Sequence, residues 1–248
     1  KWWICSPETV GNFSGTAYFF ARALHEQLKV PVGIIHSSWG GTSIEAWTSW
    51  EAQQNDKRLL MVHQPWKDKP EPNQNKPGNL FNGMVNPHIP YGIRGAIWYQ
   101  GERNSRNITF AKAYSIQLPM MINDWRRRWG QGDFPFLWAQ LPNFKAVNPD
   151  PNATSIWAHT RESMAKTLSL PNTGMATTID IGEARDIHPK NKQDVGRRLA
   201  NWALAEFYNQ EEVPTSGPMY ASHEIKGAKV RVQFRYAPGL KAKAGDAV

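Results

Sequence analysis

The sequence predicts an α/β fold in which a parallel β-sheet is covered by helices on both faces. Short apolar runs rich in β-branched or aromatic residues alternate with longer segments of helical periodicity, and each run ends in small or polar residues. Strands alternating with helices of this length form right-handed βαβ crossovers and a parallel sheet. A chain of 248 residues is long enough for one large domain of this kind.

The first helix and strand are expected near the N-terminus. Apolar residues at helical spacing over residues 17–28 predict an amphipathic helix. The stretch VPVGIIHSS follows, and it predicts a buried strand over residues 30–38 that runs into a polar loop. Residues 53–79 have little periodicity and are rich in Pro, Asn, Gln and Lys, so they are expected to form a long surface excursion.

Three more strand–helix pairs complete the alternation. The predicted strands are RGAIWYQG from Arg94, FPFLWAQLP from Phe134, and GMATTID from Gly174 to Asp180. The predicted helices span residues 110–129, 155–168 and 189–208. Pro119 must kink or divide the first of these helices, and Pro189 suits the first position of the last.

The pattern changes after residue 212. The stretch KVRVQFRY alternates apolar and polar residues after a Lys-Gly turn, which predicts antiparallel strands. The chain then ends in KAKAGDAV, before such a module looks complete. We therefore expect an α/β domain over residues 1–212 and the beginning of a β-rich module over residues 213–248.

Composition excludes several classes of protein. The shares of 40% hydrophobic and 20% charged residues are those of a globular protein, and no apolar run approaches the ~18 residues of a membrane span. The net charge of +8 is scattered apart from short basic runs on predicted helices, so we expect neither a nucleic-acid nor a membrane partner. Twelve tryptophans favour stacking platforms for sugar rings, although most tryptophans are core residues.

Polar residues follow each predicted strand of the sheet. These segments are SSWGG, QGERN, LPNF and DIGEARDIH, and ligands of parallel α/β sheets bind beyond the carboxyl ends of the strands. Gly40 and Gly41 can present backbone N–H groups to a bound oxygen, and the amide of Gln100 can add a second donor. The alternative for the glycines is an ordinary tight turn.

His188 is the candidate base at this edge. An imidazole titrates near neutral pH, and a carboxylate that accepts its other N–H fixes the tautomer, a role open to Asp186 or Asp180. A lone histidine near an aspartate is usually unremarkable. Two possible oxyanion donors together with a base nevertheless favour acyl transfer.

Three long segments resemble those that mark sialate O-acetylesterases, within the wider SGNH-hydrolase and carbohydrate-esterase superfamily. They are PVGIIHSSWGGTSIEAW, NGMVNPHIPYGIRGAIWYQGERN and DIHPKNKQDVGRRLA, in the expected order, and the resemblance spans roughly residues 1–208. It implies a flavodoxin-like, three-layer α/β/α sandwich that removes acetyl groups from sugars with a serine nucleophile and a histidine base. No metal or other cofactor is expected.

The resemblance also assigns roles to individual residues. Gly41 and Gln100 match the oxyanion donors and His188 matches the base. The usual acid position, three residues before the histidine, holds Arg185 here. Asp186 is therefore the expected acid, with Asp180 in reserve. The expected substrate contacts are Trp39, Gly40, Glu102, Arg103 and Asn104.

The nucleophile is the main departure from the family pattern. The family carries it in a GQSN-type segment after the first strand, and the sequence has none. Ser37 and Ser38 stand where the family does not place the nucleophile, and Ser14 suits a helix cap. We therefore expect a piece of an esterase without its first βα unit, whose serine comes from another segment or a second chain. An unpaired sheet edge or an uncovered sheet face would follow.

Two other functions stay open at this stage. A catalytically inactive carbohydrate-binding fragment fits the missing nucleophile, and an acetyl-xylan esterase fits the same site residues. The expected partner is an acetylated sugar in each case. The expected location is secreted, periplasmic or lysosomal.

Overall fold

The centre of the protein is a three-stranded parallel sheet. The structure, a computed structural model, describes residues 2–69, 73–150 and 152–241. The strands lie in the order β1 (Ala96–Trp98), β2 (Phe136–Ala139) and β3 (Thr173–Ala176). Three of the four predicted strands are thus confirmed, although β3 ends at Ala176 and not at Asp180.

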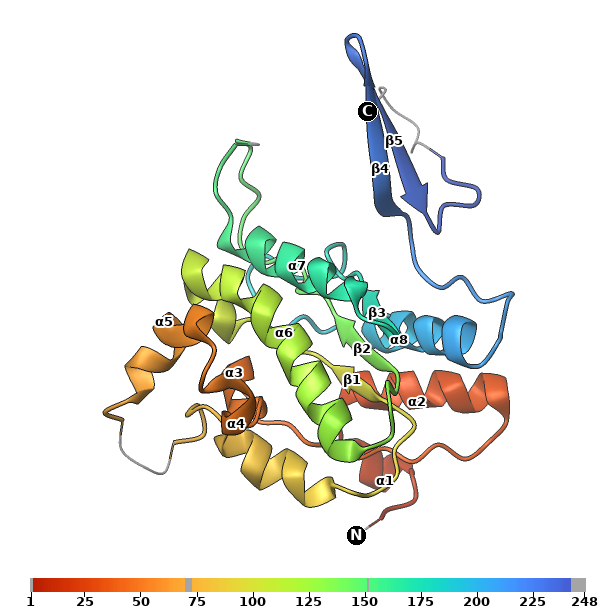
Figure 1. Cartoon of the computed structure of the whole chain (residues 1–248). Helices are drawn as coiled ribbons and strands as arrows, with labels where there is room; N and C mark the ends of the chain where they lie inside the picture. Colours follow the sequence, from red (N-terminus) through yellow and green to blue (C-terminus); the bar gives the residue numbers. More distant parts are fainter. Residues whose placement is uncertain (1, 70–72, 151, 242–248) are drawn as a thin grey trace.

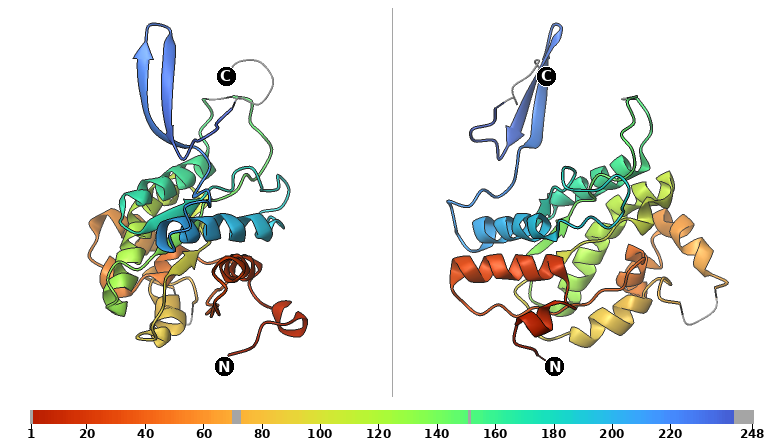
Figure 2. Two further views of the ribbon diagram at one scale, coloured as in Figure 1. Left: turned by 90° about the vertical axis from the view of Figure 1, so that its right-hand side faces the viewer. Right: turned by 180° about the vertical axis from the view of Figure 1, so that it is seen from behind.

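Helices cover both faces of this sheet (Figures 1 and 2). The four long helices are α2 (Gly15–Leu28), α6 (Ile108–Trp129), α7 (Ile156–Lys166) and α8 (Lys192–Phe207). Side chains of β2 alternate between two apolar clusters: Phe136 and Trp138 pack with residues of α6 and α7, whereas Leu137 and Ala139 pack with residues of α2 and α8. The α/β/α layering expected from the sequence is confirmed.

Two helix predictions need correction. Of the two predicted effects of Pro119, the division of the helix does not occur: α6 continues through Pro119, where Leu118, Met121 and Ile122 are fully buried and their packing compensates for the lost backbone hydrogen bond. The α8 helix begins at Lys192 and not at Pro189. Asn191 is its N-cap and accepts the backbone N–H of Asp194 at 3.0 Å.

The excursion over residues 53–79 is partly packed against the core and is not purely a surface loop. It contains η1 (Lys57–Leu59), α5 (Leu60–His63) and η2 (Gln64–Trp66). Leu59 and Val62 are fully buried beside Phe110. Residues 70–72 lie outside the described residues. The remaining short helices are α1 (Pro7–Val10), α3 (Ile44–Trp47), α4 (Trp50–Gln53), η3 (Phe81–Val85), η4 (Asn86–His88), η5 (Arg103–Arg106) and η6 (Thr167–Ser169).

The C-terminal strands form a hairpin that projects from the α/β body (Figure 1). β4 (Met219–Lys226) and β5 (Lys229–Arg235) pair antiparallel, as the alternation predicted. Gly227 has a φ of 60° in the turn between them. Almost all of the final KAKAGDAV stretch, residues 242–248, lies outside the described residues.

The predicted strand over residues 30–38 does not form. This segment is extended but makes no sheet hydrogen bond in the described part of the chain. A cavity of about 450 Å³ is lined by Val32 and Ile34 of the segment and by Ile97 and Trp98 of β1. The segment remains unpaired because no described strand occupies the space between it and β1.

The free edge of β1 faces this cavity. The backbone N–H of Ala96 donates to the carbonyl of Pro135 on the β2 side at 2.9 Å. Successive residues of a parallel strand direct their backbone groups to opposite edges, so the N–H and C=O of Ile97 face away from β2. Neither group has a partner among the described residues. Leu24 of α2 and Trp125 of α6 line the cavity from the two helical layers.

Candidate functional site

The glycine loop lies directly after the extended segment. Gly41 has a φ of 68°, a left-handed conformation that suits glycine, and the Thr42 hydroxyl donates to the Trp39 carbonyl at 2.7 Å. Gly40 and Gly41 are exposed, and within the described ranges their backbone N–H groups have no acceptor. The loop therefore offers free donors to an oxygen that approaches from solvent.

Gln100 lies against this loop, just beyond the C-terminal end of β1. Its Nε2 donates to the Thr42 carbonyl and to Asn104 Oδ1, both at 2.9 Å, and its Oε1 accepts the Tyr114 hydroxyl at 3.0 Å. The side chain is buried, and both amide hydrogens have acceptors. The structure thus brings Gln100 and the glycine loop together although they are about 60 residues apart in the chain.

The residues that follow Gln100 differ widely in accessibility. Asn104 has no exposed surface, so it cannot touch a sugar as expected from the sequence. Its Oδ1 accepts the backbone N–H of Ile44 at 3.1 Å, and its Nδ2 donates to Glu45 at 3.0 Å. Arg103 is exposed to solvent. The role of Asn104 is therefore internal, whereas Arg103 remains accessible to a ligand.

His188 lies on the exposed loop between β3 and α8. Its side chain is 86% exposed, and its Nδ1 is 3.6 Å from Oδ1 of Asp186, which also accepts the His188 backbone N–H at 2.8 Å. Asp180 instead forms two hydrogen bonds with Arg198, at 2.6 and 2.7 Å, and these lower the pKa of Asp180. Asp186, and not Asp180, is the carboxylate beside the imidazole.

Glu102 follows the end of β1 and lies near the charged residues of the loop that carries His188. Burial raises the pKa of Glu102, and the nearby charges of Lys192 and His188 oppose that rise. Burial lowers the pKa of Lys192, which is opposed by Glu102, Asp186 and Glu183. Opposite charges thus gather at one edge of the sheet. Lys192 could not be singled out from the sequence, because its nearness to Glu102 arises only when α8 packs against the sheet.

A serine–histidine contact lies in the segment that leads into the glycine loop. Ser38 Oγ is 2.6 Å from His36 Nε2, and both residues are exposed. The His36 ring packs against Phe13, and in the described part of the chain it has no carboxylate partner. Ser37 Oγ donates to the Met84 carbonyl at 2.8 Å. Without an orienting acid, the Ser38–His36 pair lacks a component of a hydrolytic triad.

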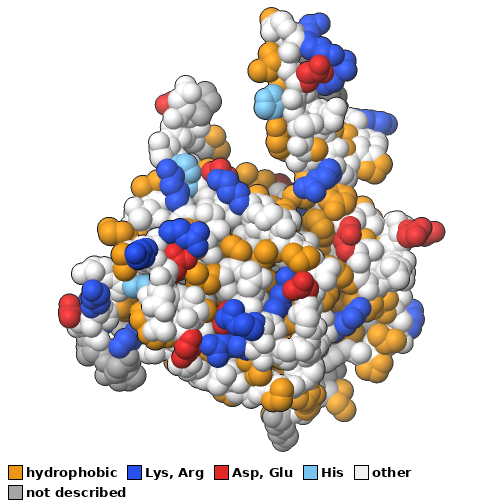
Figure 3. Space-filling view, viewed as in Figure 1, with side chains coloured by type: hydrophobic (Ala, Val, Ile, Leu, Met, Phe, Trp, Pro, Cys, Tyr) orange, Lys and Arg blue, Asp and Glu red, His pale blue; other side chains and the backbone are white. Residues whose placement is uncertain are grey.

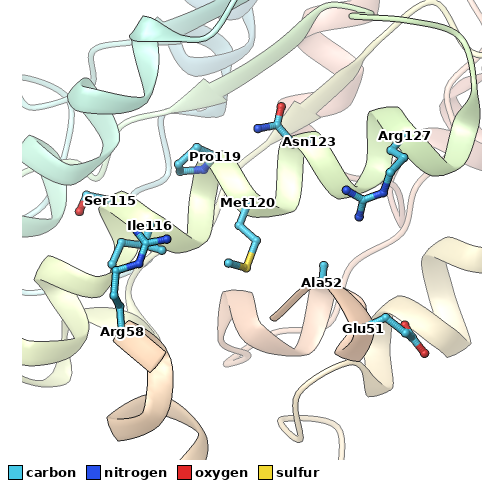
Figure 4. Close-up of a pocket in the computed structure, with 9 residues that line it drawn as sticks. All are labelled: Glu51, Ala52, Arg58, Ser115, Ile116, Pro119, Met120, Asn123 and Arg127. Atoms are coloured by element: carbon cyan, nitrogen blue, oxygen red, sulfur yellow. The ribbon is translucent and has the colours of Figure 1, made fainter. Parts of the chain in front are cut away.

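A larger hollow lies elsewhere, against α6. It has a volume of about 630 Å³ and is lined by residues of α4, η1 and α6, including Ala52, Ser115 and Met120 (Figure 4). Arg58 and Arg127 border it, but each is paired, with Asp56 at 2.6 Å and with Asp124 at 2.8 Å. Because none of the predicted site residues lines it, this hollow is separate from the candidate site.

Charged side chains are mixed on the face that carries α6. Lys and Arg lie interspersed with Asp and Glu and with apolar side chains (Figure 3). A continuous basic surface of the kind that binds a phosphate backbone is therefore absent from the described side chains of this face. Separately, none of the helices in the described residues is long and apolar enough to cross a membrane.

Comparisons with known proteins identify the family and the fold. The sialate O-acetylesterases of Pongo abelii and Homo sapiens are each 30% identical over 266 residues, covering 99% of this chain and 50% of the relative. A crystal structure of a carbohydrate acetylesterase from Xanthomonas citri has a TM-score of 0.80 and 40% identity, covering 93% of this chain and 49% of that one. A protein from Arabidopsis thaliana, at 18% identity and a TM-score of 0.52 over 76% of this chain and 67% of its own, shares the fold.

The chain thus spans about half the length of these two sialate O-acetylesterases and of the Xanthomonas citri enzyme. The family model for carbohydrate esterases described as sialic acid-specific acetylesterases matches residues 8–205. That range includes the glycine loop, Gln100 and His188. On this evidence, the chain belongs to the sialic acid-specific acetylesterase family of carbohydrate esterases.

Proposed function

We propose that the protein containing this chain is a carbohydrate O-acetylesterase that acts on O-acetylated sialic acid. The hydrogen bond between Gln100 Nε2 and the Thr42 carbonyl, 2.9 Å, carries this proposal. This hydrogen bond holds the Gln100 amide beside the glycine loop, whose backbone N–H groups are free within the described residues. Glu102 lies at the same edge of the sheet, where burial raises its pKa and the charge of His188 opposes that rise. Two donors and a base at one edge are the components of ester hydrolysis.

The proposed reaction is acyl transfer through a serine outside this chain. The serine oxygen attacks the acetyl carbonyl while His188 takes its proton, and Asp186 steadies the imidazolium. The N–H groups of Gly41 and Gln100 stabilise the oxyanion, which displaces the Thr42 carbonyl as acceptor of one Gln100 hydrogen. The bond between the acetyl carbon and the sugar oxygen then breaks, and His188 gives its proton to that oxygen, so the sugar leaves with a free hydroxyl and the acetyl group stays on the serine. A water deprotonated by His188 finally cleaves the acetyl-serine and releases acetate.

The cavity beside β1 supports an external nucleophile. Ile97 presents unpaired backbone groups on one side, and the extended segment around Val32 and Ile34 lies on the other. An extended strand inserted there would pair with β1 and extend the parallel sheet. Its carboxyl end would then lie at the edge that holds Gln100. A segment of a longer polypeptide, or failing that a second chain, would bring the serine into the site in this way.

Two exposed side chains support a sugar substrate with a carboxylate. Trp39, 54% exposed beside Gly40, can stack on a sugar ring. Arg103 is exposed one residue after Glu102 and can pair with the carboxylate of sialic acid. Acetyl-xylan offers the stacking surface but lacks that charge. Preference for the sialic acid ester is therefore expected to fall when Arg103 is replaced by Met.

Acetate release by the longest natural polypeptide that contains residues 1–248 tests the function. It should hydrolyse O-acetylated sialic acid faster than acetyl-xylan, and His188→Ala should lower the activity by about 10³-fold while Ser38→Ala should retain it. The chain of residues 1–248 alone should not hydrolyse either ester. Sugar binding without hydrolysis by the longer polypeptide would instead identify a carbohydrate-binding protein. Faster hydrolysis of acetyl-xylan would overturn the substrate assignment.

A further inference from the structure

Glu45 is a buried carboxylate that the proposed reaction does not use. It lies in α3 and is 1% exposed. Its Oε2 accepts Asn104 Nδ2 at 3.0 Å and Gln117 Nε2 at 3.1 Å, whereas its Oε1 has no partner among the described residues. Burial raises the pKa of Glu45, and these hydrogen bonds together with the charge of Arg106 oppose the rise. Burying a carboxylate costs free energy, so a carboxylate at position 45 is expected to serve a role that offsets this cost.

Glu45 is one end of a directed chain of hydrogen bonds. Trp98 Nε1 donates to the Tyr114 hydroxyl at 3.1 Å, and that hydroxyl donates to Gln100 Oε1 at 3.0 Å. Gln100 Nε2 donates to Asn104 Oδ1 at 2.9 Å, and Asn104 Nδ2 donates to Glu45 at 3.0 Å. An indole N–H can only donate and a carboxylate can only accept. The two ends therefore favour one direction for the bonds between them, which is also favoured by the Ile44 N–H donating to Asn104 Oδ1 and by the Thr42 carbonyl accepting from Gln100 Nε2.

This direction decides which end of the Gln100 amide faces the glycine loop. A primary amide can turn by half a rotation and exchange its oxygen and nitrogen. Here the nitrogen faces the Thr42 carbonyl at 2.9 Å. A turned amide would place Gln100 Oε1 against that carbonyl, and the two oxygens would repel each other. In the turned amide, Gln100 Oε1 would also repel an oxyanion bound at the glycine loop.

We infer that Glu45 is a positioning residue that keeps the Gln100 N–H group directed at the oxyanion site. This inference rests on the proposed function, in which Gln100 donates to the oxyanion. Glu45 acts only through Asn104 and does not touch the substrate. An amide in its place has a similar shape but can donate as well as accept, so the contribution of the carboxylate to this direction is lost and only the Ile44 N–H and the Thr42 carbonyl still favour it.

Three variants of the longest natural polypeptide test the inference. Glu45→Gln should lower kcat by about 10-fold or more while KM changes by less than about 3-fold, a smaller loss than deleting an oxyanion donor outright. The double variant Glu45→Gln/Asn104→Asp moves the acceptor-only group one link closer to Gln100, and its kcat should return to within about 3-fold of wild type. The control Gln117→Met removes the second donor to Glu45 without touching Gln100. It should retain kcat.

Hydrogen exchange provides a readout that does not depend on activity. In glutamine-labelled wild-type protein, the buried side-chain amide protons of Gln100 should exchange slowly because both have acceptors. They should exchange faster in Glu45→Gln and slowly again in the double variant. If the three proteins show this pattern of exchange but the wild-type protein hydrolyses no ester, the proposed function is refuted. The role of Glu45 in orienting the Gln100 amide would still stand.

Other outcomes would overturn the inference. One is wild-type kcat in Glu45→Gln, and another is a folded double variant as slow as Glu45→Gln. Equal losses of kcat in Glu45→Gln and Gln117→Met would reduce Glu45 to a general contribution to stability. Slow exchange of Gln100 in Glu45→Gln would show that the carboxylate does not impose the direction.

Discussion

The two sides of the proposed site are built in different ways. On the donor side, Gln100 is 8% exposed and every polar atom of its side chain has a protein partner. On the base side, His188 is 86% exposed and has one side-chain contact, at 3.6 Å from Asp186. Under the proposed function, packing beyond the end of β1 preorganises one oxyanion donor, Gln100, whereas a surface loop holds the proposed base.

The loop of the base has few anchors. The Gly182 backbone N–H donates to Asn143 Oδ1 at 2.7 Å, and a Cβ at Gly182 would overlap the Asn143 carbonyl oxygen. Asp180 pairs with Arg198 at 2.6 Å, and the Lys145 N–H donates to the Ala184 carbonyl at 3.1 Å. Replacing residues on either side should therefore separate effects on chemistry from effects on stability.

The largest effect is expected on the base side. His188→Ala should lower kcat/KM for an acetylated sugar by about 10³-fold, within the range of general base catalysis. The melting temperature should stay within about 1 °C of wild type because the side chain is exposed. Steady-state kinetics and thermal melts measure both. A comparable loss in His36→Ala, with His188→Ala active, would transfer the role of base to the Ser38–His36 pair.

Replacing Gln100 on the donor side should lower both the turnover rate and the stability of the fold. Gln100→Ala should lower kcat by about 10²-fold, the typical cost of an oxyanion donor. It should also lower the free energy of unfolding by about 1–3 kcal/mol, because Asn104 and Tyr114 lose buried hydrogen-bond partners. Kinetics together with urea unfolding separate the two losses. Unchanged turnover would remove Gln100 from the reaction.

The sequence predicts the sheet well where the partner strands lie within the chain. The apolar runs from Arg94, Phe134 and Gly174 become strands that pair with one another. The run from Val30 carries a similar pattern yet remains unpaired. Apolar patterning reports the burial that a segment favours, but a strand also needs a neighbour to bond with.

The candidate site was predictable where residues directly follow a strand. Gln100 follows β1, so its place at the sheet edge could be read from the sequence. The roles of Asn104 and Glu45 could not, because a Glu or Asn near a helix start is ordinarily expected to be exposed. Their contact at 3.0 Å arises from elements 59 residues apart and depends on tertiary packing.

A smaller effect is expected from the loop anchor. Gly182→Ala should displace the histidine loop, since the added Cβ would overlap Asn143, and lower kcat by about 10-fold. Its matched control is Gly217→Ala, where a Cβ meets no atom within 4 Å and activity should be unchanged. Kinetics of both variants provide the measurement. Equal activity in the two would show that the anchor does not place His188.

The smallest effect is expected from the exposed ion pair. Arg198 holds the pKa of Asp180 below its usual value, so the pair stabilises the fold at pH values above that usual pKa. This stabilisation is lost as the pH falls through the lowered pKa. Asp180→Asn should therefore reduce the free energy of unfolding at pH 7 by at most about 1 kcal/mol, and the difference should vanish in strong acid. A difference that grows in acid would contradict the lowered pKa.

Covalent trapping of the nucleophile tests the central claim most directly. The longest natural polypeptide containing residues 1–248 would be treated with a fluorophosphonate, which labels activated serines, and the labelled residue found by peptide mass spectrometry. We predict one labelled serine outside residues 1–248 and loss of labelling in His188→Ala. Labelling of Ser38, or undiminished labelling in His188→Ala, would contradict a site completed by an external serine and served by His188.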